Sequence, residues 1–534
     1  MAAPAIATQD LPIAHRAGLA VLGGSCLLGF AAACFITMGP LGFGFPLTVL
    51  AAFGIYCLVN RVSLVRPQSK ANYLWIPILL FSALLAWRDA PTLKFLNLLT
   101  VAVFGGIIAI RARPSMISKG SAWDYPFRAL GAWFVAFVDT FNLLFNDIAW
   151  RLIPQGGHGK NLTSTFRGLL LATPLLLVFG ALFANADAGF EKLLTQMFSF
   201  NAEIIVQQSF IGFGFAWFAA GLLRRVYIGH FATEGGRASE SSSVPPLPIS
   251  SPTSPIQQSK IEQSSNPPRL GLLETTIVLG SLNALFLLFV ATQWPYFFGG
   301  IQTLRETSGL SVAEYARRGF FELVAVSALA LPTLLGLHAL IDPDSVRMRR
   351  VFKFLSLALV ALLLVVMLSA ALKMRLYMET YSLSTLRIYV AAALAFLGLV
   401  FAWFSLTTLR ERANRFAWGG TLVFAMMVLG LNVLNPDSFV ARWNIQNTNG
   451  KPIDWNYLRT LSADATPAIA RNWGKVPKDS RPKIADALIN NNSSRDWRSQ
   501  NLSQFEAQRS LNANEAEIEK AAKEYVEPNY EYGY

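Results

Sequence analysis

Three charged residues stand four apart in the stretch 293–322, which joins two strongly apolar runs. In a helix, Glu314, Arg318 and Glu322 would stack on one face, and Arg317 would fall on the adjoining face. Carboxylates placed in this way can act as general bases and arginines can hold phosphate groups. The same side chains also form ion pairs that fix helix ends. The stretch therefore indicates either a binding site or a structural charge ladder.

A second stretch, 373–387, has the same character, because Arg375 and Glu379 are four residues apart with Tyr377 between them. Amphipathic rings such as that of Tyr296 can fill the space between the two stretches. We expect one polar cluster that binds a partner or lipid. Its predicted members are Asp187, Tyr296, Glu314, Arg317, Arg318, Glu322, Arg375, Tyr377, Glu379 and Arg387.

The elements that hold the residues of this cluster in place are long apolar runs of the sequence. Of 534 residues, 53% are hydrophobic and only 14% are charged, a composition typical of a membrane protein. Runs of about 20 apolar residues match the bilayer hydrocarbon core, and their lack of period-two alternation excludes a barrel. We predict an all-α, polytopic transmembrane helix bundle of eleven spans. They lie at 18–38, 41–59, 72–87, 92–110, 168–186, 205–228, 271–293, 320–341, 351–372, 388–409 and 416–435.

Lysines and arginines are unevenly shared between alternate connections. With the N-terminus in the cytoplasm, the cytoplasmic connections and their flanks carry 23 basic residues, and the opposite connections carry nine. Basic residues are retained on the cytoplasmic side, so we expect this orientation. Eleven spans then place both charged stretches and the C-terminal region outside the cytoplasm. The first run is expected to be a retained span and not a cleaved signal.

One segment leaves the number of spans open. Residues 130–150 are apolar but contain Asp139 and Asp147, and Asp139, Asn142 and Asn146 share one helical stripe. A charge at mid-bilayer costs about 3 kcal/mol on insertion scales, so an interfacial helix is favoured. The alternative is a twelfth span with a polar lining, which would return the C-terminus to the cytoplasm.

Composition divides the chain into four parts. The segment 237–269 has ten serines and seven prolines, which indicates a flexible linker without enough apolar surface to fold. In the last part, helical periodicity occurs in 454–472, 480–490 and 496–524, and a disordered tail is the competing interpretation for 505–534. The predicted parts are 1–231 (N-terminal membrane half), 232–269 (cytoplasmic linker), 270–435 (C-terminal membrane half) and 436–534 (soluble helical region).

Cysteine and charge patterns exclude several kinds of site. Cys26, Cys34 and Cys57 lie in the first two runs, where we expect buried, small apolar residues. No Cys/His spacing suggests a metal site, and no cofactor is expected. The segment 436–534 carries 13 basic and 13 acidic residues, so the net charge of +13 belongs to the membrane part. It indicates topology and attraction to anionic lipid, not nucleic-acid binding.

Several spaced strings resemble the bacterial multi-pass membrane proteins of the domain-of-unknown-function 4173 family. They are Gln293–Gly300, Ala313–Phe320, Arg375-Leu-Tyr377, Glu379, Tyr381–Arg387, Asn435-Pro-Asp437, Ala441-Arg442, Asn444, Asp454, Tyr457-Leu458, Leu461–Ala465 and Asp496-Trp-Arg498. Ser382 and Ser384 depart from the glycine and threonine of the family pattern, and the serine/proline linker is an addition. The resemblance implies a bacterial inner-membrane protein whose activity is not assigned.

Three classes of function remain open on the sequence. We favour a non-enzymatic envelope protein that binds a partner or lipid at its extracytoplasmic face. A transporter or channel would need ionisable groups deep in the bilayer, and the chain offers few. A membrane-embedded enzyme acting on a lipid-linked substrate is the third class, but the sequence has no H-E-x-x-H, G-x-S-x-G or Walker signature and no predicted catalytic residue.

Overall fold

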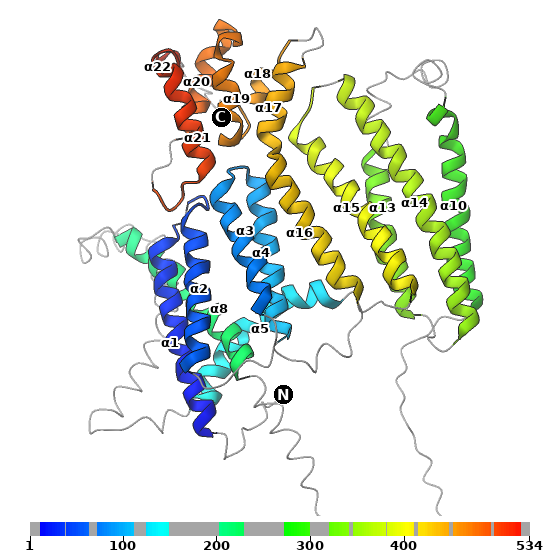
Figure 1. Cartoon of the computed structure of the whole chain (residues 1–534), viewed down its shortest axis with the longest axis horizontal. Coiled ribbons are helices and arrows are strands. Elements are labelled where there is room, and N and C mark those ends of the chain that lie inside the picture. The colour runs from blue at the N-terminus through cyan, green and yellow to red at the C-terminus, as the bar shows by residue number, and fades with distance from the viewer. Residues whose placement is uncertain are drawn as a thin grey trace, which may run out of the picture. The chain divides into compact units, whose positions relative to one another are not determined.

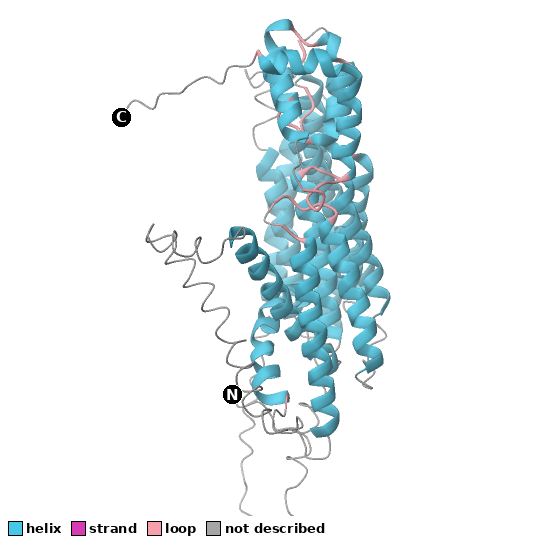
Figure 2. Cartoon of the chain, turned by 90° about the vertical axis from the view of Figure 1, so that its left-hand side faces the viewer, coloured by secondary structure: helices cyan, strands magenta, loops and turns pink. Residues whose placement is uncertain are grey.

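The computed structural model describes residues 11–37, 39–62, 72–111, 124–148, 202–228, 272–298, 320–340, 345–380, 382–410, 415–447, 452–492 and 496–524. Within these ranges every regular element is a helix and none is a strand (Figure 2). The all-α class predicted from the sequence is confirmed.

The helices form two units (Figure 1). The C-terminal helices belong with the N-terminal ones, although the whole of the second unit intervenes in the chain. Unit 1 contains α1 (Leu11–Phe35), α2 (Gly44–Val62), α3 (Trp75–Trp87), α4 (Pro91–Arg111), α5 (Asp124–Asn142), the π-helix η3 (Leu143–Asp147), α8 (Ala202–Tyr227), α18 (Trp455–Leu458), α19 (Thr466–Arg471), α20 (Arg481–Asn492), α21 (Leu502–Leu511) and α22 (Glu515–Lys523). Unit 2 contains α10 (Leu272–Phe298), α13 (Phe320–Leu340), α14 (Val346–Thr380), α15 (Thr385–Thr407), α16 (Phe416–Leu434) and α17 (Pro436–Gln446).

Six helical segments in the described part are long and apolar enough to cross a membrane. They are Ala17–Phe35, Gly44–Arg61, Pro91–Ala109, Val346–Leu372, Thr385–Arg410 and Phe416–Leu434. Three shorter apolar segments, Asn72–Trp87, Thr275–Leu288 and Leu329–His338, coincide with further predicted spans. The predicted run at 168–186 lies outside the described residues, and the count of eleven spans stays a prediction.

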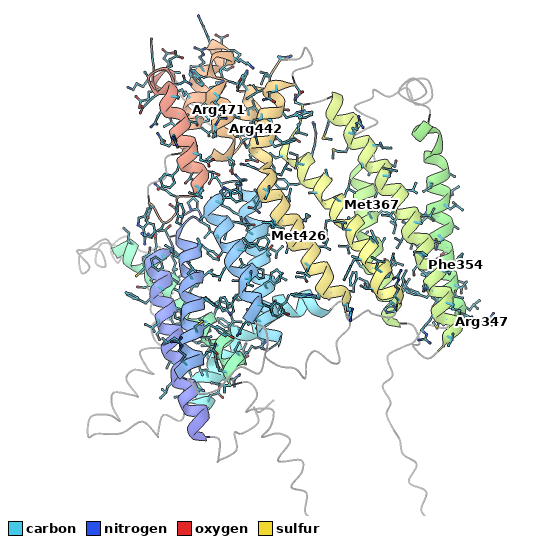
Figure 3. The ribbon with its side chains drawn as sticks, viewed as in Figure 1. Arg347, Phe354, Met367, Met426, Arg442 and Arg471 are labelled. Atoms are coloured by element: carbon cyan, nitrogen blue, oxygen red, sulfur yellow. The ribbon has the colours of Figure 1, made fainter. Side chains whose placement is uncertain are left out.

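Unit 2 is apolar outside as well as inside. Phe354 on α14 and Met426 on α16 are 72% and 66% exposed, whereas Met367 is 7% exposed (Figure 3). A helix that is apolar all round suits a lipid environment, because its outer face meets hydrocarbon and not water. The buried faces of α14 and α15 meet in one core that includes Leu363, Phe401 and Phe404.

In unit 1, α1 packs closely on α8. A Cβ atom at Gly29 would overlap the Gly212 carbonyl, so the two backbones can approach only because both residues are glycine. Tyr227, fully buried at the end of α8, donates to Asn60 Oδ1 at 2.6 Å, and its Oη lies 3.1 Å from the Tyr56 carbonyl oxygen. These contacts hold α2 against α8.

The helix α16 ends where the sequence predicted that the last apolar run would end. Asn435 adopts a left-handed conformation (φ 53°) and its side chain accepts from the Ser438 amide at 3.3 Å, so one residue ends α16 and caps α17. Pro436 then occupies the first position of α17, where its missing N–H costs nothing. The last run predicted at 416–435 thus ends where α16 ends, at Leu434 and its cap Asn435.

The C-terminal helices surround a small core of their own, which includes Trp455, Trp473, Ile484 and Leu511. Because α21 and α22 continue to Lys523, the interpretation of 505–523 as disordered is wrong. Helices were predicted in this region, and they occur in all three predicted segments.

The expectation for the cysteines is wrong. Cys26, Cys34 and Cys57 are free and exposed on the surfaces of α1 and α2. An apolar helix in a membrane can present a small polarizable side chain to lipid, so an apolar neighbourhood in the sequence does not imply burial.

Candidate functional site

The predicted polar cluster falls only partly within the described structure. Asp187, Glu314, Arg317 and Arg318 lie outside the described residues. Tyr296, Glu322, Tyr377 and Glu379 belong to α10, α13 and α14, and the structure describes their backbone only. Arg375 is exposed on the last turns of α14, and Arg387 is half-buried in the first turn of α15.

The helix ends that carry these residues lie at one end of unit 2. The C-terminal ends of α10 and α14 and the start of α15 are together there (Figure 1). Arg387 Nη1 donates to the Ser382 carbonyl, and the Asn444 side chain both accepts from the Leu383 amide at 2.9 Å and donates to its carbonyl at 2.8 Å. Arg387 and Asn444 therefore fix the α14–α15 connection. That the predicted residues form one binding cluster remains a prediction.

Unit 1 contains a better-defined polar site, which we call the junction. It joins the α3–α4 connection to the C-terminal helices through Asp89 and Asp464. Asp464 has a fully buried side chain, and its Oδ2 accepts from the backbone N–H groups of Asp89 at 2.8 Å and Ala90 at 3.0 Å. Its Oδ1 accepts from Ser503 Oγ at 2.5 Å and lies 3.6 Å from Arg88 Nη1.

Asp89 returns the same kind of contact. Its Oδ2 accepts from the Ala463 N–H at 3.2 Å, at the start of the short 3₁₀-helix η7 (Ala463–Ala465). Its Oδ1 accepts from Asn501 Nδ2 at 2.7 Å and pairs with Lys94 Nζ at 2.9 Å. Each aspartate thus satisfies backbone donors at the start of the other's helix, where a carboxylate also suits the helix dipole.

A second contact region, which we call the seam, lies beside the junction. It joins residues 498–500 to the end of α1 and the start of α2. The backbone N–H groups of Phe43 and Gly44 donate to the carbonyls of Gln500 and Arg498, both at 2.9 Å. Arg498 Nη1 also donates to the Cys34 carbonyl at 3.1 Å. The C-terminal helices are therefore attached to the α1–α2 and α3–α4 connections, at the end of unit 1 that lies away from the start of α1.

Asp496 orients Arg498 in this seam. The two side chains pair at 2.6 Å, and the hydrogen bond from Arg498 lowers the pKa of the Asp496 carboxyl below its ordinary value. Both side chains are partly exposed, so the pair directs the arginine towards α1 more than it stabilises the fold.

A third polar group, which we call the network, is buried among α5, η3 and α8. Arg224 pairs with both aspartates, through Nη1 to Asp139 Oδ1 at 2.9 Å and through Nη2 to Asp147 Oδ1 at 3.2 Å, and its Nε also donates to Asp147. Arg225 Nε donates to Asp139 Oδ2. All four residues are buried, and their charges cancel.

The helices that carry the network approach each other closely. A Cβ at Gly221 would overlap the Ala136 carbonyl, so α5 lies directly on α8. Thr140 Oγ1 donates to the Trp217 carbonyl at 2.7 Å, and Trp217 Nε1 donates to the Phe137 carbonyl at 3.1 Å. These contacts hold the two helices in the register that the ion pairs need.

The π-helix η3 explains why Asp147 was missing from the polar stripe that the sequence predicted on Asp139, Asn142 and Asn146. Eight residues of ideal α-helix would leave Asp147 about 80° away from Asp139. The wider turn of η3 (Leu143–Asp147) changes this angle, and Asp147 reaches the same arginine as Asp139. From the sequence, Arg224 and Arg225 were expected only to mark the cytoplasmic side of the membrane. Two aspartates inside an apolar segment were the signal that they needed cationic partners.

These groups do not form a reaction centre of a familiar kind. In the described part of the chain, no group of three His, Cys, Asp or Glu side chains could hold a metal ion. The carboxylates of the junction and of the network are all occupied by amides or cations. Among the described residues, their hydrogen bonds and ion pairs join helices.

Comparison with known proteins identifies a family. The sequence matches the family described as Domain of unknown function (DUF4153) over residues 75–472, that is, over 398 of 534 residues. No curated protein and no solved structure shows significant similarity to the chain.

The family match corrects the resemblance stated above. A domain-of-unknown-function family is found, but not the 4173 family. Many residues of the strings that suggested the 4173 family are aromatic or charged, and membrane interfaces favour such residues whatever the family. The matched region begins at α3 and ends just after α19, so it includes unit 2 and part of unit 1. The chain is therefore an integral membrane protein that belongs to the Domain of unknown function (DUF4153) family.

Proposed function

We propose that this protein is a non-enzymatic protein of the bacterial inner membrane that engages lipid through its extracytoplasmic face. In this proposal the N-terminus lies in the cytoplasm and the C-terminal helices lie outside, on the lipid–water boundary. The excess of basic residues in the predicted cytoplasmic connections supports this orientation. Transport remains the alternative.

One observation carries the proposal. Trp497, Leu502 and Phe505, which we call the boundary patch, are 53%, 47% and 53% exposed. They flank the seam in which residues 498–500 bond to the start of α2, and the rings of Phe505 and Phe43 lie 6.1 Å apart. Because α2 is long and apolar enough to span the membrane, its start marks the boundary.

The residue types of the boundary patch suit that place. Tryptophan is enriched at the membrane interface because its ring is amphipathic, and exposed leucine and phenylalanine gain from contact with acyl chains. A large apolar patch facing water would instead be an aggregation liability. We infer that the patch enters the head-group region of the outer leaflet.

Spin labels test the contact with lipid. In a variant whose three native cysteines are alanine, nitroxides are placed at Leu502→Cys, Phe505→Cys and, on the exposed face of α22, Glu517→Cys. In phosphatidylethanolamine/phosphatidylglycerol vesicles, the first two should collide more with oxygen than with a water-soluble nickel complex, and the third should do the reverse. Equal access to nickel at all three sites would contradict the proposal.

Impermeant maleimide tests the orientation in intact cells. Glu517→Cys, Glu306→Cys and Ser382→Cys should react before permeabilisation, and Lys260→Cys in the predicted cytoplasmic linker only afterwards. Residues 306 and 382 belong to the two charged stretches of unit 2. If they reacted from opposite sides, the predicted polar cluster would not exist.

A further inference from the structure

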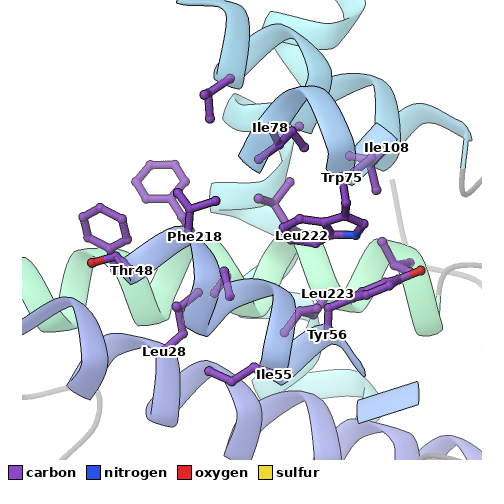
Figure 4. A pocket seen from close by; sticks show the side chains of 18 of the residues that line it. Leu28, Thr48, Ile55, Tyr56, Trp75, Ile78, Ile108, Phe218, Leu222 and Leu223 are labelled. Carbon is purple, nitrogen blue, oxygen red and sulfur yellow. The ribbon is translucent and has the colours of Figure 1, made fainter. Parts of the chain in front are cut away.

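A cavity of about 210 Å³ lies inside unit 1, among α1, α2, α3, α4, α5 and α8 (Figure 4). It exceeds the roughly 150 Å³ of an engineered apolar cavity that stays dry and takes up benzene. Its lining is almost entirely hydrocarbon and aromatic. It is partly open, because Phe218 on its wall is 38% exposed.

The cavity is elongated along the helices. On α2 its lining runs from Phe45 to Tyr56, and on α8 from Phe215 to Val226. Each stripe covers about 16 Å of helix, at 1.5 Å per residue. The hydrocarbon core of a bilayer is about 30 Å thick, so one leaflet contributes about 15 Å. The length of the cavity therefore matches one acyl chain of one leaflet.

The two ends of the cavity differ in polarity. Figure 4 shows Thr48 near one end, and Tyr56 and Trp75 near the other. Tyr56 Oη donates to Asn72 Oδ1 at 2.8 Å, but the buried Nε1 of Trp75 has no hydrogen-bond partner among the described residues. A buried N–H without an acceptor is costly, so an ester oxygen at this end would recover a hydrogen bond.

The surroundings of unit 1 indicate which kind of molecule fills the cavity. Water does not fill a cavity that offers almost no polar partners, whereas the helices around it face hydrocarbon: Leu50 on α2 and Phe210 on α8 are both 53% exposed. A bilayer supplies acyl chains of the right length at the right depth. We propose that the cavity binds one acyl chain of a membrane phospholipid, with its ester end towards Tyr56 and Trp75.

Trp75 begins α3, and the junction lies past the other end of this helix, at Arg88 and Asp89. The ester end of the proposed chain therefore faces away from the junction. This site is independent of the proposed function, and either can fail alone.

Photo-cross-linking tests the site in the full chain. The protein is reconstituted in phosphatidylethanolamine/phosphatidylglycerol vesicles containing a phosphatidylglycerol with a mid-chain diazirine. Ala52 and Ala219 both line the cavity, and Ala52→Phe and Ala219→Phe fill it with side chain. We expect cross-links at Val49, Ile108 and Leu222 in the native protein, with at least a fivefold loss in the filled variants.

Leu50→Phe, on the exposed face of α2, provides the matched control and should leave the cross-links unchanged. Because a filled variant can misfold, lipid is also extracted from the native protein after purification, and one retained phospholipid per chain is expected. Cross-links spread evenly over Leu50 and Phe210 with none in the cavity would overturn the proposal. So would retention of an isoprenoid quinone in place of phospholipid.

Discussion

Unit 1 holds two buried polar groups of the same composition and different construction. The junction and the network each contain two aspartates and two cations. In the junction the carboxylates accept mainly from backbone N–H groups and neutral side chains. Lys94 pairs in addition with Asp89, and Arg88 lies near Asp464. In the network, the hydrogen bonds to the carboxylates come from Arg224 and Arg225.

The difference follows from what each group joins. The junction attaches helix starts, which have unpaired N–H groups and can satisfy a carboxylate without any cation. The network lies between helix bodies, whose N–H groups are already used within the helix. Only side chains can neutralise a carboxylate there. We conclude that the network depends on its arginines and that the junction does not depend on its lysine.

The two groups lie at opposite ends of α1. The network's Asp147 and its neighbour Ile148 lie beside Gly18, whereas Arg498 of the seam bonds to Cys34. Sixteen residues of α-helix between these positions span about 24 Å, close to the thickness of the hydrocarbon core. With α1 across a bilayer, as its length and composition allow, each group would lie near one boundary, where a charged residue costs less than at the midplane.

The largest effect is expected for Arg224→Met. The change leaves two buried carboxylates with reduced neutralisation, and breaking a buried ion pair costs about 3–5 kcal/mol. The thermal unfolding midpoint of the purified protein in detergent should fall strongly. Arg224→Lys keeps the charge but not the multiple contacts, so it should fall between this variant and the native protein. Arg347→Met, at an exposed position of α14, is the control and should be neutral.

Asp464→Ala should have the next largest effect. It removes the acceptor of two buried backbone N–H groups and of Ser503, at about 1–3 kcal/mol for each donor left unsatisfied. The C-terminal helices should detach from the α3–α4 connection before the membrane helices unfold. Limited proteolysis should therefore release a fragment from within 455–524. Unchanged protease resistance would show that the seam alone holds these helices.

Lys94→Met compares the junction directly with the network. Asp89 keeps its bonds to Ala463 and Asn501 when the lysine is removed, so the loss should be that of one hydrogen bond between charged groups, about 1.5–3 kcal/mol. The thermal midpoint should fall less than in Arg224→Met. If the two variants were equally unstable, the distinction between backbone-satisfied and cation-satisfied carboxylates would be wrong.

The smallest effect on the protein is expected when the pH is lowered. The pKa of Asp496 is lowered by its hydrogen bond from Arg498, so the pair contributes above the ordinary carboxyl pKa and is lost as pH falls through the lowered value. Cleavage near residue 498 by an acid-active protease should rise in that range. Asp496→Asn should remove this pH dependence, because it lacks the carboxylate at every pH, and its segment near residue 498 should be as susceptible to cleavage at neutral pH as the native segment is in acid.

Much of the fold could be predicted from the sequence because it depends on local composition. Apolar runs gave the helices, and Asn435-Pro436 gave the boundary between α16 and α17. The C-terminal helices followed from periodicity. The predicted polar cluster did not receive the same support, since Asp187, Glu314, Arg317 and Arg318 lie outside the described residues and several others are described by backbone only.

What the sequence by itself determined is the class of protein: long apolar runs need a lipid solvent, and in lipid the backbone must be helical. Only the tertiary structure decided which charges meet. Asp89 and Asp464 are far apart in the chain, and Asp147 reaches the same arginine as Asp139 because a π-helix lies between the two aspartates. Pairings of this kind depend on which helix ends and helix faces pack together, and local spacing carries no information about them.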